Sequence, residues 1–310
     1  MRAVRNTESG IEVVTVTAPP PDATTVRVRS SGICGSDLHL MQWGALPFTL
    51  GHEVGGVLAD GTPVAVWPSR PCGSCDRCRA GAPTQCRTAA ASGYGIGTDG
   101  GMADAMVVDT ANVFALPDGV TPADGALVEP IACSVHAFRR AGVARGDRVA
   151  VIGGGSIGLG AAAVGRWLDC PVDLLARHPA QRAAATAIGA GAKPRGEYDV
   201  VVDAAGTASA IASCFSLLRP GGTVVLVASY WEPVEFPQFF TMKEPTIVSA
   251  TIHGDTEDGH DMAAAAQLLA DIPEVPGALI THRLPLDRAA EAFRIAADRA
   301  AGAIKVVLEP

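Results

Sequence analysis

The chain has 310 residues, of which 48% are hydrophobic and 18% charged, and its formal net charge is −8. A chain of this length exceeds what one hydrophobic core usually spans, so two domains are expected. An acidic surface repels phosphate backbones, which argues against nucleic-acid binding, and no run approaches the roughly 18 apolar residues of a membrane helix.

The first residues, "MRAVRNTESGIEVV", are polar and predict an opening strand or hairpin. They lack the apolar centre of a signal peptide. We therefore expect a cytoplasmic protein with no membrane partner, in which the eight cysteines stay reduced.

Three separated segments each carry a residue type that binds zinc. Cys34 lies in "GICGSDLHL", His52 in "GHEVGG" and Glu129 in "VEP". One Cys, one His and one carboxylate would form a three-ligand zinc site with a position open for water or substrate. Each residue alone has an ordinary explanation, since a single Cys is usually a small buried residue and a single His a hydrogen-bonded structural one.

Between these segments lies a run of four cysteines with the spacing C-x2-C-x2-C-x7-C: Cys72, Cys75, Cys78 and Cys86. Short C-x2-C steps let thiolates converge on one ion, and four thiolates without an open position form a structural zinc site. Free surface thiols, a redox pair and an iron–sulfur cluster are the alternatives. The spacing favours structural zinc.

The second half begins with a dinucleotide-binding pattern. Val149–Ile152 is a short apolar run typical of a buried parallel strand, and Gly153, Gly155 and Gly158 then form G-x-G-x-x-G ahead of a helix predicted over Leu159–Leu168. These glycines permit a tight turn, close approach of a pyrophosphate and close helix–strand packing. The motif's Ser156 and Ile157 belong to the same predicted site, at the positive end of the helix.

The next strand, predicted over Val172–Ala176, indicates which coenzyme is bound. An NAD site normally has a carboxylate at this strand end, but Ala176 stands there and Asp173 lies too early. Arg177 could pair with a 2′-phosphate, and His178 follows it. NADP(H) is therefore favoured over NAD(H). In the alternative, Arg177 stacks on adenine and NAD is also accepted.

The strand–helix rhythm continues to the C-terminus. Strands are predicted over Asp199–Asp203 and Thr223–Ala228, with a helix over Ser209–Leu218 between them. Ala228 and Ser229, at a strand's carboxyl end, are expected to offer backbone contacts to nicotinamide. The tail predicts a helix over Leu286–Arg299, with Ala289, Ala290, Phe293 and Ala297 on one face, and a strand over Ile304–Leu308.

Taken in order, these segments resemble the zinc-containing alcohol dehydrogenase family of medium-chain dehydrogenases over nearly the whole chain. The glutamate before a proline at Glu129 resembles the polyol, threonine and sugar dehydrogenase branch. The resemblance implies two zinc ions per chain, a catalytic one on Cys34, His52 and Glu129 and a structural one on the four clustered cysteines. It places Glu53 beside the catalytic zinc, as an outer neighbour or alternate ligand.

The same resemblance implies further roles. Asp37 would accept a hydrogen bond from His52 and fix its tautomer. Ser36 would take the substrate proton and His39 would pass it to solvent; a turn residue and a surface residue are the ordinary alternatives. Lys305 would reach the coenzyme phosphate, with a solvated lysine as the alternative.

The implied fold is α/β with two domains. Residues 1–133 and 271–310 would form a mostly β, GroES-like catalytic domain with the zinc lobe at 72–86, and residues 134–270 a Rossmann domain with a doubly wound parallel sheet. The passage "GAKPRGEY" before the strand at 199 is shorter than the family's, which predicts that a peripheral helix is lost or reduced.

The implied function is hydride transfer between NADP(H) or NAD(H) and a small-molecule secondary alcohol, polyol, sugar or amino alcohol. A homodimer or homotetramer is expected. Gln42, Trp43 and Phe240 are candidates to line the substrate pocket. The alternatives are a catalytically silent relative that binds coenzyme or zinc as a sensor or scaffold, and a zinc-independent reductase of activated double bonds.

Overall fold

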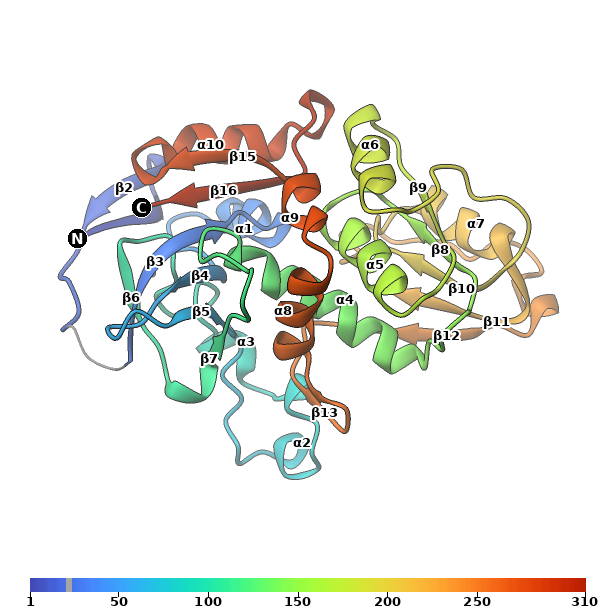
Figure 1. Ribbon diagram of the computed structural model, residues 1–310, viewed down its shortest axis with the longest axis horizontal. Coiled ribbons are helices and arrows are strands. Elements are labelled where there is room, and N and C mark those ends of the chain that lie inside the picture. Colours follow the sequence, from blue (N-terminus) through green and yellow to red (C-terminus); the bar gives the residue numbers. More distant parts are fainter. Residues whose placement is uncertain (21–23) are drawn as a thin grey trace. The chain divides into compact units, whose positions relative to one another are not determined.

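The computed structural model describes residues 1–20 and 24–310. Their contacts divide the chain into two compact units (Figure 1). The first unit comprises Met1–Glu129, Gly254–Ala270 and Ile280–Pro310, and the second comprises Pro130–His253 and Asp271–Leu279. None of the helices within the described ranges has the length and apolarity needed to span a membrane.

The first unit is mostly β. Its seven-stranded sheet has the order β15-β16-β3-β4-β5-β7, with β6 also paired to β3, and all its pairs are antiparallel except β15 with β16. The strands are β3 (Thr25–Gly32), β4 (Glu53–Val57), β5 (Pro63–Val66), β6 (Ala105–Val107), β7 (Val113–Ala115), β15 (Ile280–Pro285) and β16 (Lys305–Glu309), beside the hairpin of β1 (Arg2–Thr7) and β2 (Gly10–Thr15) and the short pair β13 (Asp255–Thr256) and β14 (Gly259–His260). The helices are α1 (Gly35–Leu40), α2 (Asp76–Arg79), α3 (Ala89–Ser92), α8 (Asp261–Asp271) and α10 (Ala289–Ala297).

Alternating valines explain the core of this sheet. Val26 and Val28 of β3 are buried with Val54 of β4 and Val64 of β5, as the two-residue period of a strand requires. The same unit has a second core cluster, into which helix α10 packs Ala289, Ala292 and Phe293. The predicted helical face was therefore partly wrong: Ala290 and Ala297 are exposed, because the 3.6-residue period aligns 289, 292, 293 and 296.

The second unit is a parallel five-stranded sheet of order β12-β11-β10-β8-β9, which confirms the predicted parallel architecture. Its strands are β8 (Val149–Ile152), β9 (Val172–Leu175), β10 (Tyr198–Asp203), β11 (Leu218–Leu226) and β12 (Thr246–Ser249). Its helices are α5 (Ser156–Trp167), α6 (Pro179–Ala187), α7 (Ala208–Leu217) and α9 (Glu274–Leu279), together with most of α4 (Val128–Ala141).

Among the residues that the structure describes, no strand takes the place of strand 3 in the usual dinucleotide-binding order 3-2-1-4-5-6. In the described residues β9 is an edge strand, and the place of strand 3 is reduced to Gly191, which accepts a hydrogen bond from Leu174 at 2.7 Å and donates one to Val172 at 2.9 Å. A Cβ on Gly191 would lie 1.9 Å from Asp173 Oδ1, so a larger residue there would require the Asp173 side chain to move. In the described residues, the short passage "GAKPRGEY" therefore leaves the sheet without this strand, whereas the sequence predicted only that a peripheral helix is lost or reduced.

The division between the units differs from the expected domain boundaries. His260 packs against Trp67 and Phe114 of the first unit, with ring centroids 4.6 and 4.3 Å apart. Helix α9 contacts α5 and α6 of the second unit, where Asp271 also accepts a 2.8 Å hydrogen bond from Trp167. Residues 254–270 and 271–279 therefore lie in the opposite units from those expected.

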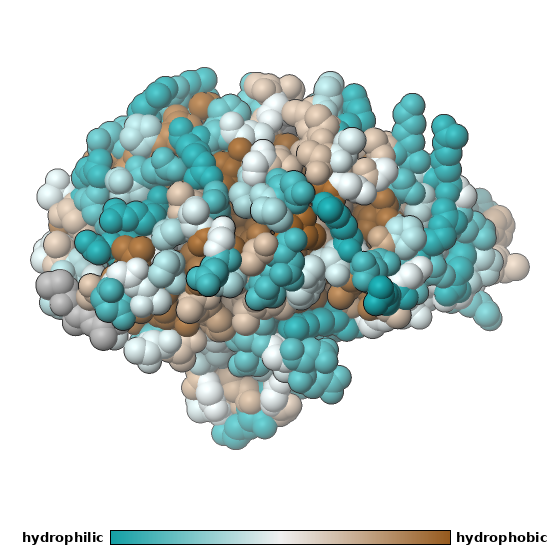
Figure 2. Space-filling model, in the orientation of Figure 1, coloured by the Kyte–Doolittle hydropathy of each residue, from teal (hydrophilic) through white to brown (hydrophobic). Residues whose placement is uncertain are grey.

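The surface shown in Figure 2 is largely polar although 48% of the residues are hydrophobic. On the face shown in Figure 2, hydrophilic side chains protrude widely and hydrophobic ones lie between them in small patches.

Candidate active site

The turn from β3 into α1 fixes the first candidate ligand. Cys34 is the N-cap of α1, and the Asp37 carboxylate accepts a hydrogen bond from the Cys34 N–H at 2.8 Å. Asp37 is fully buried. The sequence C-G-S-D thus closes a reciprocal cap that holds the Cys34 thiol in place.

His52 reaches the same place from the loop before β4. Gly51 has φ +99°, and a Cβ there would lie 2.6 Å from side-chain atoms of Met102 and Ser31, so only glycine can precede His52 in this way. The imidazole is buried, with Nε2 3.3 Å from Ser36 Oγ and Nδ1 3.4 Å from Asp37 Oδ1.

The charges around His52 determine its protonation in the absence of metal. Burial lowers the pKa of His52, but the negative charges of Asp37 and Cys34 outweigh this and raise the pKa well above its ordinary value. A buried imidazole between two anionic groups is a position that favours a cation.

Ligand atoms of Cys34, His52 and Glu53 lie within 4.8 Å of one another. A thiolate, an imidazole and a carboxylate are a donor set that zinc accepts, so these residues fit the metal. Glu129, in the first turn of α4, is also buried but is not part of this group, so among the described residues the carboxylate found with Cys34 and His52 is Glu53 and not the predicted Glu129. Burial raises the pKa of Glu53, the charge of Lys305 opposes that rise, and the charge of Glu129 adds to it.

Ser36 and His39 lie three residues apart on α1 and therefore on one face of that helix. Both side chains are partly exposed. The Ser36 hydroxyl lies 3.3 Å from His52 Nε2, and His39 follows one turn further towards the C-terminus of the helix.

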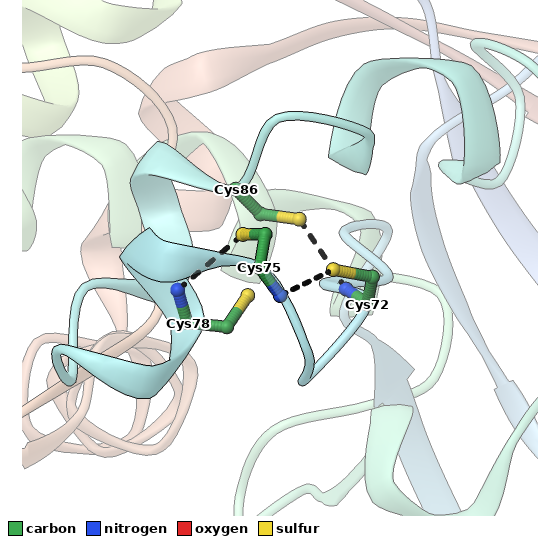
Figure 3. A group of neighbouring side chains, drawn as sticks. All are labelled: Cys72, Cys75, Cys78 and Cys86. Atoms are coloured by element: carbon green, nitrogen blue, oxygen red, sulfur yellow. Dashed lines mark hydrogen bonds between the residues drawn. The ribbon is translucent and has the colours of Figure 1, made fainter.

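The four clustered cysteines form a second, separate site (Figure 3). Their sulfur atoms lie within 4.8 Å of one another. Backbone N–H groups point at the sulfurs: Cys72 N donates to Cys86 Sγ at 3.3 Å, Cys75 N to Cys72 Sγ at 3.3 Å, and Cys78 N to Cys75 Sγ at 3.5 Å. Such bonds stabilise thiolates, the form that binds zinc.

The acidity of these thiols agrees with a metal site. A hydrogen bond from Ser74 is the main cause that lowers the pKa of Cys72 to about 5, and the Cys72 N–H lowers that of Cys86 to about 7. Burial and neighbouring thiols raise the pKa of Cys78 to about 12. Four thiolates this close repel one another unless a cation joins them, which a Zn²⁺ ion would do.

Two glycines of the motif are required by the fold itself, and the third is not. Gly153 has φ +114°, and a Cβ on Gly158 would lie 1.9 Å from the Gly153 carbonyl oxygen. By contrast, a Cβ on Gly155 would meet nothing within 4 Å. The open space at Gly155, at the N-cap of α5 and next to Ser156 and Ile157, fits an approaching phosphate.

Strand β9 ends at Leu175, one residue before the predicted end at Ala176. Ala176 is buried, Arg177 is exposed, and His178 is the N-cap of α6. Asp173 lies within the strand and accepts a 2.7 Å hydrogen bond from the Tyr198 hydroxyl. The strand end therefore presents no carboxylate of its own and an exposed guanidinium.

The chain is similar to known proteins in sequence and in fold. The descriptions "alcohol dehydrogenase GroES-like domain" and "zinc-binding dehydrogenase" match residues 20–118 and 192–271. L-Galactonate-5-dehydrogenase of Escherichia coli K12 is 32% identical over 309 residues, covering 89% of this chain and 88% of that one. Chicken sorbitol dehydrogenase is 30% identical over 321 residues, covering 89% and 86%.

The chain belongs to the zinc-containing alcohol dehydrogenase family. It is a zinc-dependent NAD(P) dehydrogenase of alcohols, with a GroES-like domain and a Rossmann sheet. Among solved structures, a zinc-binding dehydrogenase of Sinorhizobium meliloti bound to NADP has a TM-score of 0.85 and 30% identity, covering 100% of this chain and 99% of that one. An alcohol dehydrogenase of E. coli CFT073 complexed with NADH has a TM-score of 0.87 and 25% identity, with the same coverage.

Lys305 of this dehydrogenase is not where the sequence suggested. Its side chain is 1% exposed, and Nζ lies 2.6 and 2.5 Å from the two oxygens of Glu53 and 3.1 Å from the Ile33 carbonyl. The solvated alternative was wrong, and the ammonium group is directed to Glu53 instead of a coenzyme phosphate. The missed signal was a lysine within the apolar run "AIKVVL", which forms a strand buried on both faces.

The other expected residues lie in different parts of the dehydrogenase. Ala228 and Ser229 follow the carboxyl end of β11, with Ala228 N bonded to the Asp203 carbonyl at 3.1 Å. Gln42 and Trp43 are exposed in the short 3-10 helix after α1. Phe240 instead packs in the second unit in an aromatic cluster with Phe215 and Phe236.

Proposed function

We propose that this dehydrogenase oxidises a secondary hydroxyl of a polyol, sugar or sugar acid to a ketone, or performs the reverse reaction, with NADP(H) favoured over NAD(H). The observation that carries the proposal is the convergence of Cys34, His52 and a carboxylate beside the Ser36 hydroxyl. The substrate class is supported by the named activities of relatives, which act on galactonate, sorbitol and galactitol 1-phosphate.

Each residue of the site has its own role in the proposed reaction. Zinc supplies Lewis-acid chemistry at the substrate oxygen, and nicotinamide supplies the hydride acceptor. Cys34 and His52 hold the metal, and Asp37 orients the His52 ring through Nδ1. The proton lost from the substrate hydroxyl passes to Ser36 and then, through His39, to solvent, while the carbinol carbon gives up its hydride.

For the third ligand we propose Glu129, with Glu53 as its neighbour and alternate. Both Glu53 oxygens already accept hydrogen bonds from Lys305, which matches its charge within the protein. We expect Glu129→Gln to reduce bound zinc from two ions to one per chain and Glu53→Gln to retain two. Zinc analysis that finds the reverse would assign the ligand to Glu53.

The coenzyme preference rests on Ala176 and Arg177 at the end of β9. Titration followed by nicotinamide fluorescence should give tighter binding of NADPH than of NADH. We expect Arg177→Ala to weaken NADPH binding about tenfold, the order of one charge-assisted contact, and to change NADH binding less than twofold. Equal losses for both coenzymes would mean that Arg177 stacks on adenine.

A panel of sugar alcohols and sugar acids tests the reaction itself. The zinc-loaded protein should reduce NADP⁺ with at least one member that has a secondary hydroxyl, and removal of zinc should abolish the rate. Coenzyme binding without turnover on any member would favour the silent relative. Reduction of activated double bonds that survives chelation would favour the zinc-independent reductase. A homodimer or homotetramer, testable by sedimentation, and a cytoplasmic location stay predictions.

A further inference from the structure

A buried carboxylate lies at the centre of the sheet edge where coenzymes bind in such folds. Asp203 is the last residue of β10, flanked by β8 and β11, where it pairs with Ile152 and Leu226. It is fully buried. Burying a carboxylate is costly unless it is hydrogen-bonded, so its partners indicate what it does.

Both carboxylate oxygens of Asp203 are used, and they join two different segments. Oδ1 accepts the N–H groups of Ala205 at 2.8 Å and Gly206 at 3.0 Å, which shapes the loop after β10. Oδ2 accepts the hydroxyl of Tyr230 at 2.6 Å, and Tyr230 belongs to the segment after β11. Asp203 thus ties these two segments together.

These two segments also contact each other, and the first contacts the glycine motif. A Cβ on Gly153 would lie 3.0 Å from the carbonyl carbon of Ala204, and one on Gly158 would lie 3.3 Å from the Ala204 Cβ. A Cβ on Gly206 would lie 2.7 Å from the carbonyl oxygen of Ser229. A displacement of the segment that contains Tyr230 would therefore also displace the loop after β10, which packs on the glycine motif.

The Tyr230 hydroxyl is the hydrogen-bond donor in its contact with Asp203. Burial and the adjacent Asp203 raise the pKa of Tyr230 far above its usual range, so the hydroxyl keeps its proton at any working pH. The ring is partly buried against the core cluster of the second unit. Phenylalanine can replace the ring, and only the hydrogen bond to Asp203 would be lost.

We propose that Tyr230 is a positioning residue for the coenzyme: through Asp203 its hydroxyl holds the segments after β10 and β11 at the carboxyl edge of the sheet. This inference rests on the proposed function, since it concerns the binding of NADPH or NADH. Tyr230 acts through another residue and is not assigned a contact with the coenzyme.

The same unit contains a matched control. The Tyr198 hydroxyl donates to Asp173 at 2.7 Å and accepts from Arg195 N at 2.8 Å. Tyr198 begins β10, whereas Asp203 ends it, so this second tyrosine–aspartate pair lies away from the carboxyl edge. Tyr198→Phe removes the same kind of bond without touching the proposed device.

The experiment is a fluorescence titration of the zinc-loaded full chain with NADPH, at a temperature where melting curves show every variant folded. We expect Tyr230→Phe to raise the Kd five- to tenfold, about the value of one ordinary hydrogen bond, and Tyr198→Phe to change it less than twofold. An unchanged Kd for Tyr230→Phe, or equal losses in both variants, overturns the proposal.

A double-mutant cycle tests the route through Asp203. Asp203→Asn should also weaken binding, and adding Tyr230→Phe to it should cost less than twofold more. Additive losses would show that Tyr230 acts by another route and overturn the proposal. A wild-type chain that binds neither NADPH nor NADH overturns the proposed function and this inference together, whereas failure of the variants alone overturns only the inference.

Discussion

The residue that most changes the picture of the site is Lys305. Burial lowers its pKa, but the charges of Glu53, Cys34 and Glu129 outweigh burial and raise the pKa above its ordinary value. The ammonium group is therefore charged and is part of the electrostatic balance of the metal cluster. Lys305 thus places a positive charge beside the carboxylate of Glu53, which would otherwise be buried without a partner.

This predicts an asymmetric cost of mutation. Lys305→Met leaves the Glu53 carboxylate buried without its partner, which typically costs about 3–5 kcal/mol, whereas Lys305→Met combined with Glu53→Gln should recover at least half of that loss. Urea unfolding of the zinc-loaded proteins measures both. Glu291→Gln, which breaks the exposed Arg288–Glu291 pair, is the control and should leave the free energy of unfolding close to that of wild type. A Lys305→Met variant as stable as wild type would show that the Glu53 carboxylate does not need Lys305 as its partner in the folded protein.

At the scale of elements, two glycines at the start of α5 are expected to have different roles: Gly155 in coenzyme binding and Gly158 in folding. Gly155→Ala adds a methyl group to space that contacts no protein atom, so we expect normal stability but coenzyme binding weaker by roughly tenfold or more. Gly158→Ala forces a Cβ onto the Gly153 carbonyl and should instead destabilise the second unit, by about 1–3 kcal/mol or more. Melting curves and NADPH titration distinguish the two. Unimpaired binding in Gly155→Ala would place the pyrophosphate elsewhere.

The cysteine lobe should behave as an element held together by metal. Cys86→Ser removes one of four thiolates, so zinc should fall from two ions to one per chain and amide exchange should quicken across residues 72–86. Ser74→Ala removes a hydrogen bond to Cys72 Sγ but none of the four thiolates, so it is the control and should retain both ions. Unchanged exchange in Cys86→Ser would indicate that the lobe folds without its metal.

At the scale of the whole molecule, the sequence predicted what is encoded locally. The strand Val149–Ile152 was predicted with its observed bounds, and the four cysteines converge because their spacing is itself a zinc motif. The fold class followed from the order of such segments and is confirmed.

What the sequence did not reveal depends on pairing between distant segments. Glu53 and Lys305 are 252 positions apart and meet because β4 and β16 both flank β3. The packing of His260 against Trp67 and Phe114 needs a similar long-range return of the chain. No local period or spacing reports such neighbours, so the sequence pointed to Cys34 and His52 but not to the ion pair of Glu53 with Lys305 beside them.

The central claim is that the Cys34–His52 cluster is a catalytic zinc site distinct from the cysteine lobe. The most direct measurement is zinc content and polyol oxidation rate, determined together on wild type and Cys34→Ala. The account predicts two zinc ions and turnover for wild type, and one zinc ion, a folded chain, normal coenzyme binding and no turnover for Cys34→Ala. A Cys34→Ala protein that holds one zinc ion and still oxidises the substrate at the wild-type rate would contradict it.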